Sequence, residues 1–250
     1  METRNFPITI CVSSGKGGVG KTSFTVNVAL ALARKQQRVL VIDGDLGLAN
    51  VDVLLGIQVE RTIRDILENG SDPMEAVLNV EPNFWVLPAS SGVPELVNLG
   101  AEDQAQMEEI LRAISVHFDF VLVDTAAGIG PSVLWFNDFA DYSFIVLSPD
   151  PTSVTDAYAL IKVLSQHYRR NAFHLVLNLV TNEKEGRRTY DNVAKVVRHF
   201  LNLSPSYFGA IPLDEAVVRA NRERVPFLKH SPQSKAARAI TSMAEQVLRL

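Results

Sequence analysis

The chain has 250 residues, of which 47% are hydrophobic and 21% charged, and this balance excludes wholesale disorder. Its single cysteine, Cys11, excludes an intramolecular disulfide and any cysteine-clustered metal or iron–sulfur site within one chain. No apolar run approaches 18 residues and no secretory signal is present, so we expect a cytoplasmic protein without a membrane-spanning helix.

The net charge of −4 is divided unevenly along the chain. Residues 1–150 contain 9 basic and 20 acidic residues, whereas residues 151–250 contain 15 basic and 8 acidic residues. A basic part of this kind is found in proteins that bind an anionic partner, and also on Arg-rich, solvated helix faces. Both interpretations stay open at this point.

Short apolar runs alternate with longer segments of helical period. The seven predicted strands cover residues 8–14, 38–43, 84–89, 118–124, 142–148, 173–180 and 207–212. The predicted helices cover residues 21–36, 102–117, 152–169, 185–202 and 234–249. Nearly continuous apolar strands that alternate with helices are typical of a parallel sheet covered on both faces. We therefore predict an α/β fold with one doubly wound, mainly parallel sheet, in a single domain over residues 1–250.

The first predicted strand leads directly into GKGGVGKT at residues 15–22, which fits the phosphate-loop pattern G-x-x-x-x-G-K-[ST]. Its glycines let backbone N–H groups surround a phosphate, and the following helix directs its positive end toward it. Lys21 is predicted to contact the β- and γ-phosphates, and the Thr22 hydroxyl to ligate Mg²⁺. The predicted nucleotide-binding residues of this segment are Gly15, Lys16, Gly17, Gly18, Val19, Gly20, Lys21, Thr22 and Ser23.

A lysine also stands at the second position of this loop, where the general pattern requires none. With Lys16, the segment resembles the deviant Walker A signature of the MinD/ParA superfamily of ATPases. That resemblance implies a P-loop NTPase fold, ATP or ADP and Mg²⁺ as cofactors, and weak, partner-stimulated ATP hydrolysis. In the superfamily this lysine crosses the interface of an ATP-bound homodimer, where a cation neutralises charge that develops during phosphoryl transfer. The alternative for Lys16 is a solvated loop lysine.

Two predicted strands end in aspartates, Asp43 and Asp124, at the edge of the sheet where the phosphate loop is expected. Carboxylates acting directly or through water are oxygen ligands that suit Mg²⁺. Asp124 is the predicted Walker B residue; by resemblance, Asp43 supports the metal's water ligands and Asp45 positions or activates the attacking water. The alternative for each aspartate is to cap a turn. The predicted metal residues are thus Thr22, Asp43 and Asp124, and the predicted catalytic residues are Lys16, Lys21 and Asp45.

Four more residues enter the predicted site by resemblance. The Gly128 N–H is expected to sense the γ-phosphate, and Asp150 to contact the partner subunit's nucleotide or loop. Asn178 and Pro212 occupy positions that read adenine. The alternatives are a helix cap for Asp150 and a turn residue for Asn178.

Two apolar features are predicted to pack in the core. For Trp135 and Phe136, we predict packing in the core rather than a surface patch that docks a partner. The apolar stripe of residues 236–247 contains no Trp or Phe, which favours a packed helix over an amphipathic helix lying on a membrane. Membrane attachment is left open.

Longer segments narrow the resemblance to one group. Residues 45–56, 88–92, 124–129 and 151–162 closely resemble the FlhG/FleN flagellar-number regulators. The resemblance implies an ATP-driven dimerisation switch, cytoplasmic with polar or peripheral membrane placement left open. The implied partners are a flagellar SRP-type GTPase, a FleQ-type transcription activator or C-ring proteins. The D-Q-A-x-x-L-R element that many relatives carry does not precede the first strand here, so GTPase stimulation is left open.

Two other functions compete with this hypothesis. A ParA-like partition ATPase would bind DNA non-specifically through the basic residues of the C-terminal part, with a steep dependence on salt. A ligase or synthetase with the same phosphate loop is less favoured, because such enzymes do not need Lys16.

Overall fold

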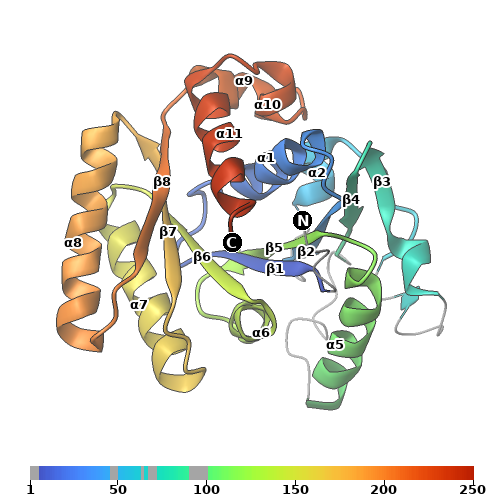
Figure 1. Ribbon diagram of the computed structural model, residues 1–250, viewed down its shortest axis with the longest axis horizontal. Helices are drawn as coiled ribbons and strands as arrows, with labels where there is room; N and C mark the ends of the chain where they lie inside the picture. The colour runs from blue at the N-terminus through green and yellow to red at the C-terminus, as the bar shows by residue number, and fades with distance from the viewer. Residues whose placement is uncertain (1–5, 46–49, 63–64, 67–71, 90–100) are drawn as a thin grey trace.

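The computed structural model describes residues 6–45, 50–62, 65–66, 72–89 and 101–250 (Figure 1). The described strands form one eight-stranded sheet in the order β3-β4-β2-β5-β1-β6-β7-β8. Neighbouring strands are parallel except for β3 and β4, which pair antiparallel at one edge. The strands are β1 (Ile8–Ser14), β2 (Val39–Gly44), β3 (Leu78–Glu81), β4 (Phe84–Leu87), β5 (Phe120–Ala127), β6 (Tyr142–Leu147), β7 (Phe173–Val180) and β8 (Ser206–Pro212).

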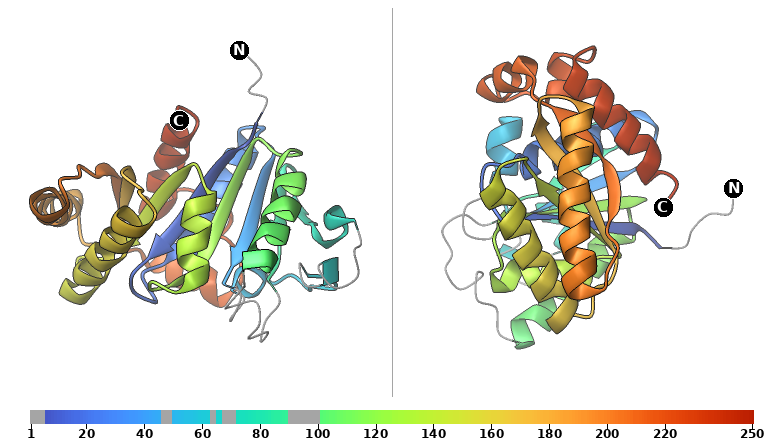
Figure 2. Two further views of the ribbon diagram at one scale, coloured as in Figure 1. Left: turned by 90° about the horizontal axis from the view of Figure 1, so that it is seen from below. Right: turned by 90° about the vertical axis from the view of Figure 1, so that its left-hand side faces the viewer.

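Helices cover both faces of the sheet (Figures 1 and 2). One face carries α1 (Lys21–Arg34), α2 (Val51–Leu55), α9 (Glu215–Arg222), α10 (Phe227–His230) and α11 (Lys235–Val247). The other face carries α5 (Ala101–Ser115), α6 (Pro131–Phe139), α7 (Pro151–His167) and α8 (Glu183–Leu201). A short 3₁₀ turn, η1 (Pro73–Ala76), precedes β3. The predicted α/β fold with a mainly parallel, doubly covered sheet is confirmed.

All seven predicted strands and all five predicted helices are present. The predicted strands 8–14 and 173–180 coincide with β1 and β7. The structure adds one strand, β3, and the helices α2, α6, α9 and α10, which we did not predict. The added elements are short, so they contain too few residues for a clear periodic pattern.

The two core predictions are confirmed. Phe136 is 1% exposed and makes an edge-to-face contact with the half-buried Trp135, with ring centroids 4.8 Å apart. In α11, Ile240, Met243 and Val247 are at most 2% exposed and pack in the same core cluster as α1. The apolar face of helix α11 is therefore buried in the core.

The strand order places the phosphate loop among the predicted acidic residues. β1 lies between β5 and β6, so the loop that follows it leaves the carboxyl edge of the sheet at its centre. In the register of β2 and β5, Asp43 lies directly beside Asp124. Residues 46–49 and 90–92, which belong to two segments carrying the FlhG/FleN resemblance, lie outside the described residues.

Candidate nucleotide-binding site

The phosphate loop connects β1 to α1 and depends on glycine at several positions. Gly18 and Gly20 have φ of +75° and +89°, in the left-handed region that glycine adopts without strain. Gly15 passes so close to α7 that a Cβ there would lie 2.2 Å from the Asp156 carbonyl carbon, whereas a Cβ at Gly17 would meet nothing within 4 Å. The loop is therefore fixed against its neighbours at one glycine and open toward solvent at the other.

This contrast gives a stability prediction. Gly15→Ala is expected to lower the free energy of unfolding by about 3 kcal/mol, because the backbone of α7 must move to admit the methyl group. Gly17→Ala, the matched control, is expected to change the free energy by less than about 1 kcal/mol. Urea unfolding followed by circular dichroism measures both. Equal stability of the two variants would contradict the loop geometry.

Lys21 begins α1 and is buried, with 9% of its surface exposed. Burial lowers the pKa of the Lys21 ammonium, and the charges of Asp124 and Asp45 only partly oppose this effect. Lys21 faces a pocket of about 480 Å³, which is lined by Gly17, Gly18, Gly20, Lys21, Thr22, Ser23, Asp45, Asn50, Val53, Leu54, Ala127, Asn221 and Arg224. Most of the predicted phosphate loop and Asp45 therefore line one pocket.

Asp124 lies within β5, three residues before its carboxyl end, and is 1% exposed. Its carboxylate accepts hydrogen bonds from the Thr22 hydroxyl at 2.6 Å and the Thr25 hydroxyl at 3.2 Å. Burial raises the pKa of Asp124 to about 7, and these hydrogen bonds and Lys21 counteract it in part. A carboxylate and a hydroxyl side by side offer the oxygen ligands that Mg²⁺ prefers. A cation bound there would favour the ionised form of the carboxylate.

Ser23 supplies a second sign that the pocket is built for a ligand. Its hydroxyl is buried, and no hydrogen-bond partner for it lies among the described residues. Buried polar groups in proteins are nearly always hydrogen-bonded. An unpartnered hydroxyl at the start of α1 therefore fits a site in which a nucleotide phosphate completes the hydrogen bonding.

The carboxylate of Asp43 is hydrogen-bonded to the backbone of its own chain, whereas the sequence predicts a role for it at the metal. Its carboxylate accepts backbone N–H groups of Asp45 at 3.1 Å, Asn50 at 2.9 Å and Val51 at 3.1 Å. Burial raises the pKa of Asp43 to about 6, although these hydrogen bonds lower it. Asn50 also donates its side-chain amide to the Asp45 carboxylate at 3.2 Å. Asp43 thus holds the segment that carries Asp45, and its role toward a metal stays a prediction.

Lys16 is bound within its own chain. Its ammonium lies 3.1 Å from the Asp150 carboxylate and 2.5 Å from the Thr152 hydroxyl. Asp150 also accepts the backbone N–H groups of Thr152 and Ser153, so it caps the N-terminus of α7. Hydrogen bonds from Thr152 and then Lys16 hold the pKa of Asp150 well below its usual range. Asp150 thus contacts Lys16 of its own chain, and its contact with a partner subunit stays a prediction.

The three remaining predicted residues also lie at this edge of the sheet. Gly128, with φ of +97°, donates its N–H to the Ser14 carbonyl at 2.8 Å, so this N–H is already used. Asn178 donates its amide to the Val19 carbonyl at 2.8 Å, which ties the end of β7 to the phosphate loop. Pro212 ends the neighbouring strand β8. The roles of Gly128, Asn178 and Pro212 toward a nucleotide stay predictions.

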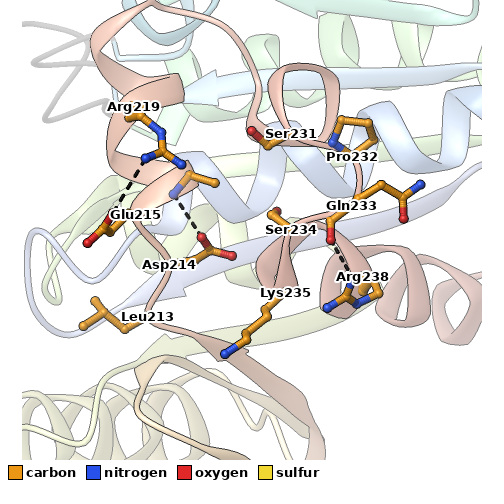
Figure 3. A pocket seen from close by; sticks show the side chains of 11 residues that line it. Leu213, Asp214, Glu215, Arg219, Ser231, Pro232, Gln233, Ser234, Lys235 and Arg238 are labelled. Carbon is orange, nitrogen blue, oxygen red and sulfur yellow. Dashed lines mark hydrogen bonds and ion pairs between the residues drawn. The ribbon is translucent and has the colours of Figure 1, made fainter.

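A second pocket lies beyond Pro212, between the start of α9 and the start of α11 (Figure 3). It has a volume of about 660 Å³ and shares no lining residue with the phosphate-loop pocket. Asp214 lines it and accepts the backbone N–H groups of Ala216 at 2.9 Å and Ala236 at 3.1 Å, so it caps both helices. We assign this pocket no part in nucleotide chemistry.

Sequence reasoning missed three polar residues of the site. Thr25 contacts Asp124 from one turn into α1, Asn50 contacts Asp45, and Thr152 contacts Lys16. Thr25 falls outside the phosphate-loop pattern, and the other two depend on loops whose course the sequence does not specify. For Thr25, the spacing of three residues after Thr22 on a helix was the available signal.

Comparison with known proteins identifies the family. The family model of ParA, described as NUBPL iron-transfer P-loop NTPase, matches residues 5–248. The chain belongs to the ParA family of P-loop NTPases. Antiactivator FleN of Pseudomonas aeruginosa is 40% identical over 95% of this chain and 85% of its own length. Flagellum site-determining protein YlxH of Helicobacter pylori is 36% identical over 94% of this chain and 80% of its own length. The FlhG/FleN resemblance is therefore confirmed.

Solved structures of this ParA family agree with the fold. The septum site-determining protein MinD of Pyrococcus horikoshii, complexed with Mg-ADP, superposes with a TM-score of 0.80 at 26% identity, covering 96% of each chain. This solved relative thus holds a nucleotide together with Mg²⁺. Iron transfer by this chain's own cysteine does not fit the structure, because Cys11 is buried within β1 and burial raises the pKa of its thiol to about 12.

Proposed function

We propose that this chain is an ATP-binding and ATP-hydrolysing switch that dimerises with bound nucleotide and regulates the number or placement of flagella. The observation that carries the proposal is the phosphate loop with Lys16 and Lys21 in a chain 40% identical to FleN over nearly its whole length. The second relative, YlxH, is a flagellum site-determining protein. A partition-type ATPase that binds DNA is not favoured by these relatives.

Each residue in and around the phosphate-loop pocket has its own proposed role toward the nucleotide. The loop N–H groups and Lys21 would bind the phosphates, Asn178 and Pro212 would contact adenine, and Thr22 and Asp124 would hold Mg²⁺. Bound there, the metal would neutralise phosphate charge. Asp45 is held beside Asn50 and would orient the attacking water, while Asp43 keeps the Asp45 segment in place.

Nucleotide-driven dimerisation would change two contacts of this structure. Lys16 would leave Asp150 and Thr152 to reach the phosphates bound by the other subunit. The Gly128 N–H would leave the Ser14 carbonyl for the γ-phosphate. These are discrete exchanges of hydrogen bonds, the kind of two-state change by which hydrolysis resets a switch.

The proposed partners are an SRP-type flagellar GTPase, a FleQ-type transcription activator or C-ring proteins. In the described part of the chain, no helix is long and apolar enough to cross a membrane. The proposed polar or membrane-peripheral placement rests on the FlhG/FleN relationship.

Lys16→Ala tests the trans contact. The variant is expected to bind Mg-ATP with wild-type affinity, stay monomeric, and hydrolyse ATP about 100-fold more slowly, since the charge supplied across the interface is lost. Lys35→Ala is the matched control, because Lys35 is also half-buried and its ammonium lies 3.0 Å from a carboxylate, that of Glu245. Lys35 does not line the phosphate-loop pocket. Light scattering and phosphate release measure both variants. A dimeric, fully active Lys16→Ala variant would overturn the trans role.

A further inference from the structure

Arg224 has an unusual backbone at the point where α9 ends. Its φ is +55°, in the left-handed region, and its N–H donates to the Asn221 carbonyl at 3.2 Å. Glycine is the usual residue directly after a helix that ends in this way, because it adopts positive φ without strain. An arginine here is conformationally disfavoured, which points to a use of its side chain.

The neighbouring structure fixes Arg224 in place. The Leu228 N–H of α10 donates to the Asn27 side chain at 2.8 Å, and Asn27 in turn donates to the Ser23 carbonyl at 2.7 Å. On another side, the Arg224 Cβ would lie 3.5 Å from a Cβ built on Gly56, at the end of α2. The segment that follows Arg224 is thus attached to Asn27 in the second turn of α1, and Asn27 is bonded to Ser23 at the phosphate loop.

The Arg224 side chain lines the same pocket as Gly17, Gly18 and Lys21. Among the described residues, neither a hydrogen bond nor an ion pair of its guanidinium is found. Arg219, within α9, pairs instead with Glu215 at 3.6 Å. An arginine without a carboxylate partner, in a pocket formed by a phosphate loop, has the planar donor set that suits phosphate oxygens.

We propose that the Arg224 guanidinium binds the phosphate groups of the nucleotide in this pocket, as a second cation of the same chain beside Lys21. The inference rests on the proposed function, because it requires that this pocket bind ATP. It adds a contact that no phosphate-loop pattern contains, delivered from the connection between α9 and α10. In this arrangement nucleotide binding also joins that connection to α1.

Arg224→Gly separates a nucleotide contact from a structural role. Glycine suits the left-handed backbone, so the variant without nucleotide is expected to unfold at the same or a higher temperature than the wild type. Its Kd for Mg-ATP is expected to rise roughly tenfold. A loss of this size is at the lower end of what removal of a hydrogen bond to a charged group costs, because the site is exposed to solvent. Arg222→Ala, the control, removes an equal charge from an arginine that does not line the pocket and is expected to leave the Kd unchanged.

A displacement assay identifies which part of the nucleotide Arg224 contacts. In this assay tripolyphosphate, which lacks base and sugar, displaces a fluorescent ATP analogue from the protein. The affinity for tripolyphosphate is expected to fall by the same factor as that for ATP in Arg224→Gly. A wild-type Kd for Mg-ATP in Arg224→Gly would overturn the inference and leave the proposed function intact. An unchanged affinity for tripolyphosphate together with weaker ATP binding would overturn the phosphate contact. A wild-type protein that does not bind Mg-ATP would overturn the proposed function and the inference with it.

Discussion

Lys21→Ala is expected to reduce the affinity for Mg-ATP by more than about 100-fold, which corresponds to about 3 kcal/mol of binding free energy. The Lys21 ammonium is buried at the start of α1 and faces the phosphate-loop pocket. Among the described residues its opposing charges are those of Asp124 and Asp45, which only partly offset the burial. Phosphate groups would supply the missing compensation, so the binding energy depends strongly on this side chain.

The fold of the Lys21→Ala variant should survive. Burial lowers the pKa of Lys21 in the folded protein. At any pH below the pKa of the unfolded chain, the charged lysine therefore disfavours folding. Removal of Lys21 is expected to leave the melting temperature equal or higher. Isothermal titration calorimetry measures the affinity, and a thermal melt without nucleotide checks the fold. Lys16→Ala serves as the control that keeps binding. Wild-type affinity in Lys21→Ala would show that ATP does not bind at this loop.

Asp45→Ala is expected to bind Mg-ATP with near wild-type affinity while its kcat falls by about 100-fold or more, as for loss of a general base. Asp45 lines the pocket, and its carboxylate is held by the Asn50 amide at 3.2 Å, while Asp43 fixes the backbone of both residues. Because hydrolysis is needed to separate the subunits, the variant should accumulate as an ATP-bound dimer.

A nearby carboxylate offers the control for Asp45→Ala. Asp52 lies in the first turn of α2, accepts the Val53 N–H and does not line the pocket, so Asp52→Ala is expected to keep its kcat. Single-turnover phosphate release measures both variants. Equal turnover by Asp45→Ala and the wild type would exclude Asp45 as the residue that prepares the water.

The sequence predicts the centre of the fold better than its edges. β1 is buried along its whole length and β7 along most of it, so their largely apolar runs indicate where both strands lie. β3 is an edge strand of four residues with half-buried and exposed side chains, and its sequence LNVE has no such run. Helix α9 has only eight residues and buries Ala216 and Ala220, so its apolar face is too short to show a clear period in the sequence.

The site shows the same division between local and distant information. The phosphate loop is contiguous, so Gly15 to Ser23 could be assigned from one motif, and Asp124 from its place at a strand end. Arg224 could not be assigned from the sequence, because only the packing of α10 on α1 brings it to the pocket. In the sequence, Arg224 is one of several basic residues that explain the charge of the C-terminal part.

Multi-angle light scattering with Mg-ATP tests the central claim, nucleotide-driven dimerisation, most directly. The wild type is expected to shift from monomer toward dimer at micromolar concentration, Asp45→Ala to be a stable dimer, and Lys16→Ala to stay monomeric. ADP should give monomers for all three. If the wild type and Asp45→Ala both remain monomeric in saturating Mg-ATP, the chain does not work as a dimerisation switch.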